Sequence, residues 1–204
     1  LEVGLNLIPV LVTARDGKTI GTTIVKVLRD VATPDWKQVL KTAPFPARDS
    51  AGELVFDNQM WLLGGYLPKV SGDIWSTPNG TDWQKIGELP SEKGINIPAN
   101  FVFRGKMWVA DNSGALFASS DGKNWETINA APPWAGRYAV GHAVFKDRMW
   151  VFGGMLRDKI FNDVWSSSDG VEWKLETASA PWSPRQLFGN VVVKDDKLWI
   201  IGGG

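Results

Sequence analysis

The sequence predicts an all-β protein, a β-propeller made of four-stranded blades. Three observations lead to this prediction: tryptophans recur at a long period, each period contains four short apolar runs, and each contains a hairpin dipeptide at a fixed place. Two tryptophan series keep step, Trp36, Trp83, Trp125 and Trp173 at intervals of 47, 42 and 48, and Trp61, Trp108, Trp150 and Trp199 at intervals of 47, 42 and 49. Strand-rich repeats of 40 to 50 residues are typical of propeller blades.

Each unit is expected to supply four strands. The first is apolar on both faces, as in an inner strand between neighbouring blades, and is expected at 54–56, 101–103, 143–145 and 191–193. A charged turn leads to the second strand, which is centred on Trp61, Trp108, Trp150 or Trp199. The third strand ends in Trp75, Phe117 or Trp165 and turns through Asn79-Gly80, Asp121-Gly122 or Asp169-Gly170, which suit a type I′ hairpin, into an outer fourth strand that opens with Trp83, Trp125 or Trp173.

The second-strand tryptophans are interpreted as packing between blades. Burying one such side chain removes roughly 150–250 Å² from water, which is worth at most about 4–6 kcal/mol. This stabilisation is reason enough for the series, without a role in stacking on a ligand. The glycine pairs Gly64-Gly65 and Gly153-Gly154 also have a structural interpretation, because they let the backbone leave a strand tightly.

Composition excludes several classes of function. The 204 residues carry 22 basic and 22 acidic side chains, so no field of one sign favours nucleic acid or an anionic membrane surface. The chain has no cysteine and one histidine, which excludes disulfides and thiolate sites and argues against a metal or cofactor. No long apolar segment or signal-peptide pattern is present, and the chain is expected to be a mature or excised piece.

Two regions are expected, an N-terminal β-hairpin region at residues 1–35 and propeller blades at 36–204. The first is either a degenerate blade or the tail of a preceding domain. About four blades' worth of strands follow, and two arrangements remain open. The chain is part of a larger propeller of six or seven blades. Alternatively, a four-blade ring closes by pairing the termini, with 24–30 and 36–40 as third and fourth strands of the last blade.

Glycine pairs that follow an apolar strand, with an aromatic residue further on, resemble the kelch repeat and the central domain of the galactose-oxidase superfamily. One unit departs, since Ala110-Asp111 replaces the glycine pair. The resemblance implies a copper site of two Tyr, two His and a Cys only for galactose oxidase itself, and the composition excludes it here. The stretch from Ser119 to Trp125 is similar to the Asp box of sialidases, which is a structural turn remote from their active site.

The candidate site is the mouth of the central channel. An arginine recurs before three inner strands, with Ile95 in its place in the fourth unit, and aromatic residues precede it. Equivalent blade positions form rings around the axis, so residues at such positions are the candidates. They are the arginines Arg48, Arg137 and Arg185; the residues five positions after each ring position, Glu53, Asn100, His142 and Asn190; and the aromatic residues Trp134 and Trp182. Either the arginines satisfy carbonyls and acids between blades, or they form an electropositive pocket for an anionic or sugar ligand.

These observations favour a non-catalytic binding or interaction propeller that recognises a carbohydrate or a protein partner through its funnel. The alternative is a carbohydrate-active enzyme of sialic-acid epimerase or sialidase-like type, with Glu53 or His142 as acid/base and the arginines holding the substrate carboxylate. The Ser-Ser-Asp-Gly hairpins resemble those of exported bacterial proteins, so the expected location is secreted, periplasmic or at the cell surface. No nucleic-acid partner or membrane span is expected, and the oligomeric state stays open.

Overall fold

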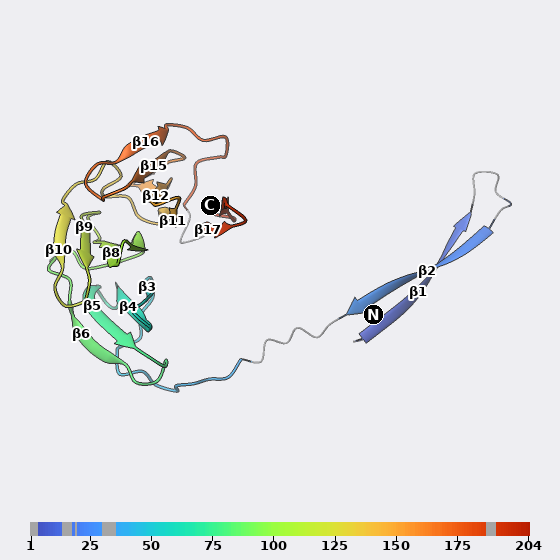
Figure 1. Cartoon of the computed structure of the whole chain (residues 1–204), viewed down its shortest axis with the longest axis horizontal. Coiled ribbons are helices and arrows are strands. Elements are labelled where there is room, and N and C mark those ends of the chain that lie inside the picture. Colours follow the sequence, from blue (N-terminus) through green and yellow to red (C-terminus); the bar gives the residue numbers. More distant parts are fainter. Residues whose placement is uncertain (1–3, 14–17, 19, 30–35, 187–190) are drawn as a thin grey trace. The chain divides into compact units, whose positions relative to one another are not determined.

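The computed structural model describes residues 4–13, 18, 20–29, 36–186 and 191–204. The chain divides into two units, Leu1–Gln38 and Val39–Gly204, and each is described by itself. The expected division fell between residues 35 and 36, a few residues earlier. Figure 1 shows the strands of both units in sequence colours.

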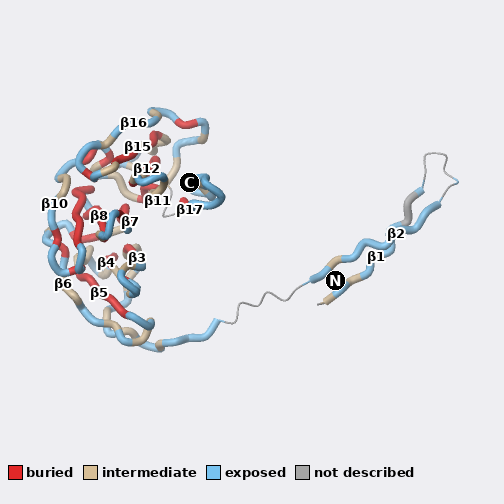
Figure 2. The backbone as a smooth tube through the Cα atoms, viewed as in Figure 1, coloured by how far each residue is buried: buried red, intermediate tan, exposed pale blue. Residues whose placement is uncertain are grey.

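The N-terminal unit is one antiparallel hairpin. Strand β1 (Gly4–Thr13) pairs with β2 (Ile20–Arg29) from Gly4↔Arg29 to Thr13↔Ile20. Most of β2 is exposed, with Leu28 74% exposed, as Figure 2 shows by its pale blue tube. Residues 36–40 form no strand and Trp36 is 88% exposed, so the expectation that this tryptophan opens an outer blade strand is wrong.

The second unit contains three complete four-stranded antiparallel blades, with strand orders β3-β4-β5-β6, β7-β8-β9-β10 and β11-β12-β15-β16. The strands of the first blade are β3 (Gly52–Phe56), β4 (Gln59–Tyr66), β5 (Val70–Thr77) and β6 (Gln84–Glu88). Those of the second are β7 (Asn100–Phe103), β8 (Lys106–Ala110), β9 (Leu116–Ser119) and β10 (Glu126–Asn129). Those of the third are β11 (Gly141–Phe145), β12 (Arg148–Phe152), β15 (Val164–Ser167) and β16 (Lys174–Thr177). The expected four-strand unit is therefore confirmed.

Two further two-stranded sheets complete the unit. A small hairpin, β13 (Met155–Leu156) with β14 (Lys159–Ile160), occupies what the sequence indicated only as a loop. Strands β17 (Val191–Lys194) and β18 (Lys197–Ile200) repeat the first two strands of a blade and pair only with each other among the described residues. The described strands are consistent with part of a larger propeller.

Positive φ angles mark the first turn of each blade. The two residues between the first and second strands have φ near +50° to +70° in all four units, as in Asp57 (49°) and Asn58 (55°) or Arg104 (47°) and Gly105 (71°). Type I′ turns require this conformation at both central positions, and their twist matches that of the flanking strands. The short charged turns seen in the sequence are thus hairpin connections.

The core consists of layers between blades. Trp61 and Trp108 each pack on the hairpin glycine of the next blade: a Cβ added at Gly122 would lie 2.2 Å from Trp61, and one at Gly170 would lie 2.4 Å from Trp108. Trp61 and Trp108 are each 6% exposed. The prediction that this tryptophan series packs between blades is confirmed for Trp61 and Trp108, whereas Trp199 is 46% exposed. It also explains the glycine of the Asn/Asp-Gly dipeptide, since any side chain there would strike the indole ring.

Inner strands β3, β7, β11 and β17 contact one another in sequence order, and Figure 1 shows the outer strands β6, β10 and β16 on the periphery. The two faces of β3 and β7 differ in how far their side chains are buried. Phe101 and Phe103 are buried, whereas Val102 is 38% and Val55 is 70% exposed. Alternate side chains of a strand point to opposite faces. In β11 both faces pack, Val144 against the cluster of Phe101 and Ala143 against that of Phe152. The expectation that both faces are packed therefore holds for β11 and is wrong at Val55 and Val102. The described residues contain no helix that could span a membrane.

Candidate functional site

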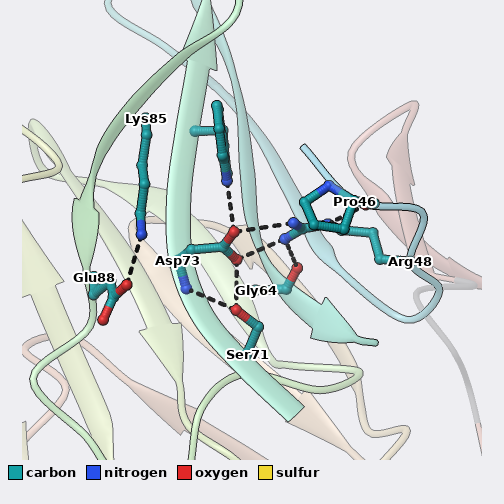
Figure 3. Close-up of polar contacts among 8 residues, drawn as sticks. Pro46, Arg48, Gly64, Ser71, Asp73, Lys85 and Glu88 are labelled. Carbon is teal, nitrogen blue, oxygen red and sulfur yellow. Dashed lines mark hydrogen bonds and ion pairs between the residues drawn. The ribbon is translucent and has the colours of Figure 1, made fainter. Parts of the chain in front are cut away.

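In the first and third blades, an ion pair joins the loop before the inner strand to the third strand of the same blade. In the first blade, Arg48 donates to both carboxylate oxygens of Asp73, at 2.6 and 2.9 Å, and to the Gly64 carbonyl oxygen at 2.7 Å (Figure 3). The carboxylate also accepts from Ser71 Oγ and from Trp75 Nε1. The Arg48 side chain is 4% exposed and that of Asp73 10%. We call this arrangement the arginine latch.

The third blade repeats the latch. Arg137 donates to Asp163 at 2.6 and 2.8 Å and to the Gly153 carbonyl oxygen at 3.1 Å, and Trp165 Nε1 donates to the same carboxylate. The guanidinium also stacks on Phe161, 3.6 Å from the ring centroid. A bidentate pair with a planar guanidinium fixes the loop in both position and angle.

The second blade lacks every charged member of the latch. The strand registers, Leu63↔Ile74 in the first blade and Ala110↔Leu116 in the second, place Ala115 at the position of Asp73. Ile95 replaces the arginine and Phe117 replaces the third-strand tryptophan. The arginine, aspartate and indole N–H are therefore present together or replaced together by apolar groups, as expected if each needs the others when buried.

Both latch carboxylates are ionised near neutral pH. Burial alone would raise the pKa of Asp73, but hydrogen bonds from Arg48, Trp75 and Ser71 outweigh it and lower the pKa to about 2. The pKa of Asp163 is likewise lowered, because hydrogen bonds from Arg137 and Trp165 overcome the effect of burial. The positive charge of each arginine is thus balanced inside the blade. Arg48 and Arg137 do not give the electropositive pocket that one interpretation of the sequence expected.

Arg185 differs from its two counterparts. It donates to the carbonyl oxygens of Gly202 (2.8 Å) and Ser183 (3.0 Å), and its bond to Gly202 matches those of Arg48 to Gly64 and Arg137 to Gly153. No carboxylate among the described residues pairs with it, and it is partly exposed.

The residues five positions after the arginine meet in the funnel. Glu53, Asn100 and His142, from β3, β7 and β11, line one cavity of about 160 Å³ together with Ser50, Ala51, Ile97 and Pro98. Asn100 Nδ2 donates to the Glu53 carbonyl oxygen at 2.8 Å, which ties the first two blades together. Glu53 is the one acidic residue in this described lining. Asn190, the fourth predicted member of the ring, lies outside the described residues.

His142 is neutral at physiological pH. Burial lowers its pKa to about 4, against a hydrogen bond with the Val140 backbone that favours the charged form. Its ring packs edge-on against Phe101, with 5.5 Å between centroids. Its buried Nδ1 has no hydrogen-bond partner in the described part of the chain. A neutral imidazole in the funnel wall can donate one hydrogen bond to a ligand and accept another, and it carries no charge that would attract an anion.

The two predicted aromatic residues lie away from this cavity. Trp134 is 1% exposed and packs edge-on against Trp173, at 5.2 Å between centroids. Trp182 is half-buried and lines another cavity, of about 470 Å³, with residues of β12, β15 and β18. Neither supplies a face for a sugar ring in the funnel.

A third cavity, of about 430 Å³, lies at the hairpin ends of the first two blades, where Asp57, Asp82 and Asp121 face Lys123. The Asp121 carboxylate already accepts the backbone N–H groups of Lys123 and Asn124 at 2.8 Å, and these bonds lower its pKa. It serves the turn. Across the described ranges, no cluster of three or more His, Asp or Glu side chains could hold a metal ion.

The functional residues that sequence reasoning overlooked are Asp73 and Asp163. Each stands 25 or more residues from its arginine, so no local pattern joins them. A signal was nonetheless present: Asp-x-Trp occurs in the two complete units that have the arginine and is replaced in the unit that has Ile95.

The fold and site define a class, a β-propeller with latched loops and a polar ring at its axis. The chain belongs to the family whose sequence model is described as "DUF6242 beta propeller domain", which matches residues 33–144. A solved propeller-like structure described as "Structure of YjhT" is similar to it, with a TM-score of 0.63, 14% identity, and coverage of 97% of this chain and 67% of that one. At this identity the likeness shows the fold alone. No curated protein matches the chain.

Proposed function

We propose that this chain is a binding propeller whose funnel cavity takes a small, uncharged polar group, such as one residue of a neutral carbohydrate. The observation that carries the proposal is the convergence of Glu53, Asn100 and His142, from equivalent positions of three blades, on one cavity. Core packing between the blades does not account for Glu53 and His142, because the core clusters consist of apolar residues, whereas Asn100 also ties the first two blades through the Glu53 carbonyl oxygen. Binding sites commonly combine a concave wall with a few convergent polar groups.

The chemistry of the lining indicates the charge of the ligand. A carboxylate, an amide and a neutral imidazole offer acceptors and donors for hydroxyl groups, while the carboxylate of Glu53 repels an anion. The cavity of about 160 Å³ is smaller than the 300–1,000 Å³ typical of drug-sized ligands, so it fits a single unit of a larger molecule. A neutral sugar residue presented from the end of a glycan fits both conditions.

The sialidase-like or epimerase-like alternative has less support. It needs arginines whose guanidinium groups can bind a substrate carboxylate. Arg48 and Arg137 instead donate to an aspartate and a backbone carbonyl oxygen within their own blades. Two finer assignments belong to the proposal: the propeller is of the kelch type, supported by Gly64-Gly65 and Gly153-Gly154, and the protein is exported, supported by the resemblance of its hairpins to those of exported bacterial proteins.

The test is a ligand titration followed at His142 by NMR. Because this is the single histidine of the chain, its imidazole signals need no assignment. Neutral monosaccharides and N-acetylhexosamines should shift these signals in a saturable way. Asn100→Ala should weaken the effect at least tenfold, the loss of a well-placed hydrogen bond in a closed site, whereas the exposed-turn control Arg157→Gln should not. The proposal fails if no neutral sugar shifts the signals at millimolar concentration.

A further inference from the structure

We propose that the cavity between the first two blades is a second binding site, which takes the guanidinium group of an arginine side chain from a protein or peptide partner. This cavity, of about 430 Å³, lies at the end of β3 away from the funnel, since Phe56, the last residue of β3, lines it, whereas Glu53 near the start lines the funnel cavity. Both walls come from complete blades. The proposal is independent of the ligand in the funnel, and three observations carry it.

The first observation is a buried hydroxyl group in the cavity wall. Ser76 on β5 is only 3% exposed and lines the cavity, and its hydroxyl forms no hydrogen bond with the described residues. In the third blade its counterpart Ser166 accepts a hydrogen bond from Arg148 Nε at 3.0 Å and donates one to Glu176 at 2.7 Å. Gln59 stands where the first blade would have that arginine. Because an unpartnered buried hydroxyl is costly, a guanidinium N–H that enters the cavity gains a ready acceptor.

The second observation is an aromatic ring that lacks the cation its counterparts have. In the second blade the turn residue Arg104 lies over the ring of Phe103, with 5.0 Å from the guanidinium carbon to the centroid, and the third blade repeats the contact with a lysine, also at 5.0 Å. Phe56 is the corresponding ring of the first blade and lines the cavity, but the turn residue that follows it is Asp57. A cation from outside the chain can therefore take the place over Phe56.

The third observation is the charge of the cavity. Arg104 pairs with Asp147 in the next turn at 2.6 Å, and the turn cation of the third blade pairs in the same way with the turn after it, at 3.0 Å. Asp57 and Gly105 occupy these positions between the first two blades, so the pair is replaced by an unpaired carboxylate. The charged groups of the lining are three carboxylates and one ammonium group, those of Asp57, Asp82, Asp121 and Lys123. The excess of negative charge favours a cation.

These contacts together select arginine. A planar guanidinium can lie on an aromatic face and still donate in its own plane to a hydroxyl and a carboxylate, whereas an ammonium group is a compact point charge. Phe56, Ser76 and Asp57 offer these three contacts in one cavity. Its mouth is open to a partner, because Asp57 and Lys123 are exposed. A volume of about 430 Å³ also holds the side chain together with part of the chain that carries it.

The test is an NMR titration of the 204-residue chain with N-acetylarginine amide. The backbone amide signals of Asp57 and Ser76 should shift in a saturable way, while the imidazole signals of His142 in the funnel should stay in place. N-acetylcitrulline amide, which has the same shape without the charge, should bind about tenfold more weakly. Asp57→Asn should weaken the binding of the arginine compound about threefold and Asp57→Arg, which supplies the repeat's own cation, should abolish it. Asp158→Asn, at an exposed turn of the third blade, is the matched control and should bind as wild type does.

Two further ligands define what the site recognises. N-acetyllysine amide should bind more weakly than the arginine compound, and so should the free guanidinium ion, because it lacks the side chain and backbone that fill the rest of the cavity. The proposal is overturned if the arginine compound gives no saturable shift up to about 20 mM, or if citrulline or lysine binds as tightly. Equal binding of the guanidinium ion overturns the assignment to a protein or peptide partner, and unchanged binding by Asp57→Arg overturns the location of the site.

Discussion

Removing Arg137 from the third-blade latch should destabilise the propeller more than the loss of any exposed ion pair. Asp163 would remain buried, 10% exposed, with Trp165 as its main donor, and the stacking on Phe161 would be lost. Breaking a buried pair by removing one partner costs about 3–5 kcal/mol. For a unit of this size that corresponds to a drop in melting temperature of roughly 10 °C. The assay is thermal and urea unfolding of Arg137→Met, followed by tryptophan fluorescence and circular dichroism.

Two matched variants make this prediction sharp. Arg104→Gln breaks an ion pair with Asp147 whose side chains are 53% and 71% exposed, and it should leave the melting temperature and the urea midpoint nearly unchanged. The triple variant Arg137→Ile, Asp163→Ala, Trp165→Phe copies the second blade and should recover most of the lost stability, because no buried polar group is left unpaired. The reasoning is refuted if Arg137→Met costs no more than Arg104→Gln, or if the triple variant is less stable than the single one.

Three further outcomes follow from the packing and the charges. Gly122→Ala should lower the free energy of unfolding by at least about 2 kcal/mol, and Gly105→Ala by about 1 kcal/mol. Both glycines have positive φ, but only the methyl group added at Gly122 would meet Trp61. Equal urea midpoints for the two variants would contradict the packing of Trp61 on Gly122. Asp121→Ala should cost about 1–2 kcal/mol in chemical unfolding, since it leaves two turn N–H groups without their acceptor, and no loss would show that the turn holds without it. The unfolded chain binds a proton at His142 near pH 6.5 and the folded chain only near 4, so unfolding free energy should rise from pH 4 to pH 6.5 by about 3 kcal/mol; a His142→Gln variant with the same slope would exclude His142 as the source.

The blade architecture could be predicted from the sequence because it is written in local patterns. Strand, I′ turn, tryptophan and Asn/Asp-Gly follow one another within about 40 residues, and each is set by backbone geometry or by a neighbour in the next repeat. The pattern misled at Trp36, which keeps the spacing but lies in no strand and is 88% exposed. Spacing identifies a residue type at a position, but a strand also needs a paired neighbour, and β2 pairs with β1.

The site was predictable only in part. The repeat places Glu53, Asn100 and His142 at equivalent inner positions, and the structure brings them to one cavity. The sequence left open whether the arginines satisfy carbonyls and acids or face a ligand, because that depends on where Arg48 finds its partner, 25 residues away on β5. Composition and local motif leave that pairing open, whereas the strand register fixes it. The role of Glu53, Asn100 and His142 in ligand binding stays a prediction.

The central claim is that the polar ring in the funnel, rather than the arginines, recognises the ligand, and calorimetric titration with a neutral N-acetylhexosamine and with sialic acid tests it most directly. The neutral sugar should bind, and sialic acid should bind at least tenfold more weakly because its carboxylate faces Glu53. Glu53→Gln should narrow this difference. Tighter binding of sialic acid, unchanged by Glu53→Gln, would contradict the account and return the recognition of an anion to the arginines.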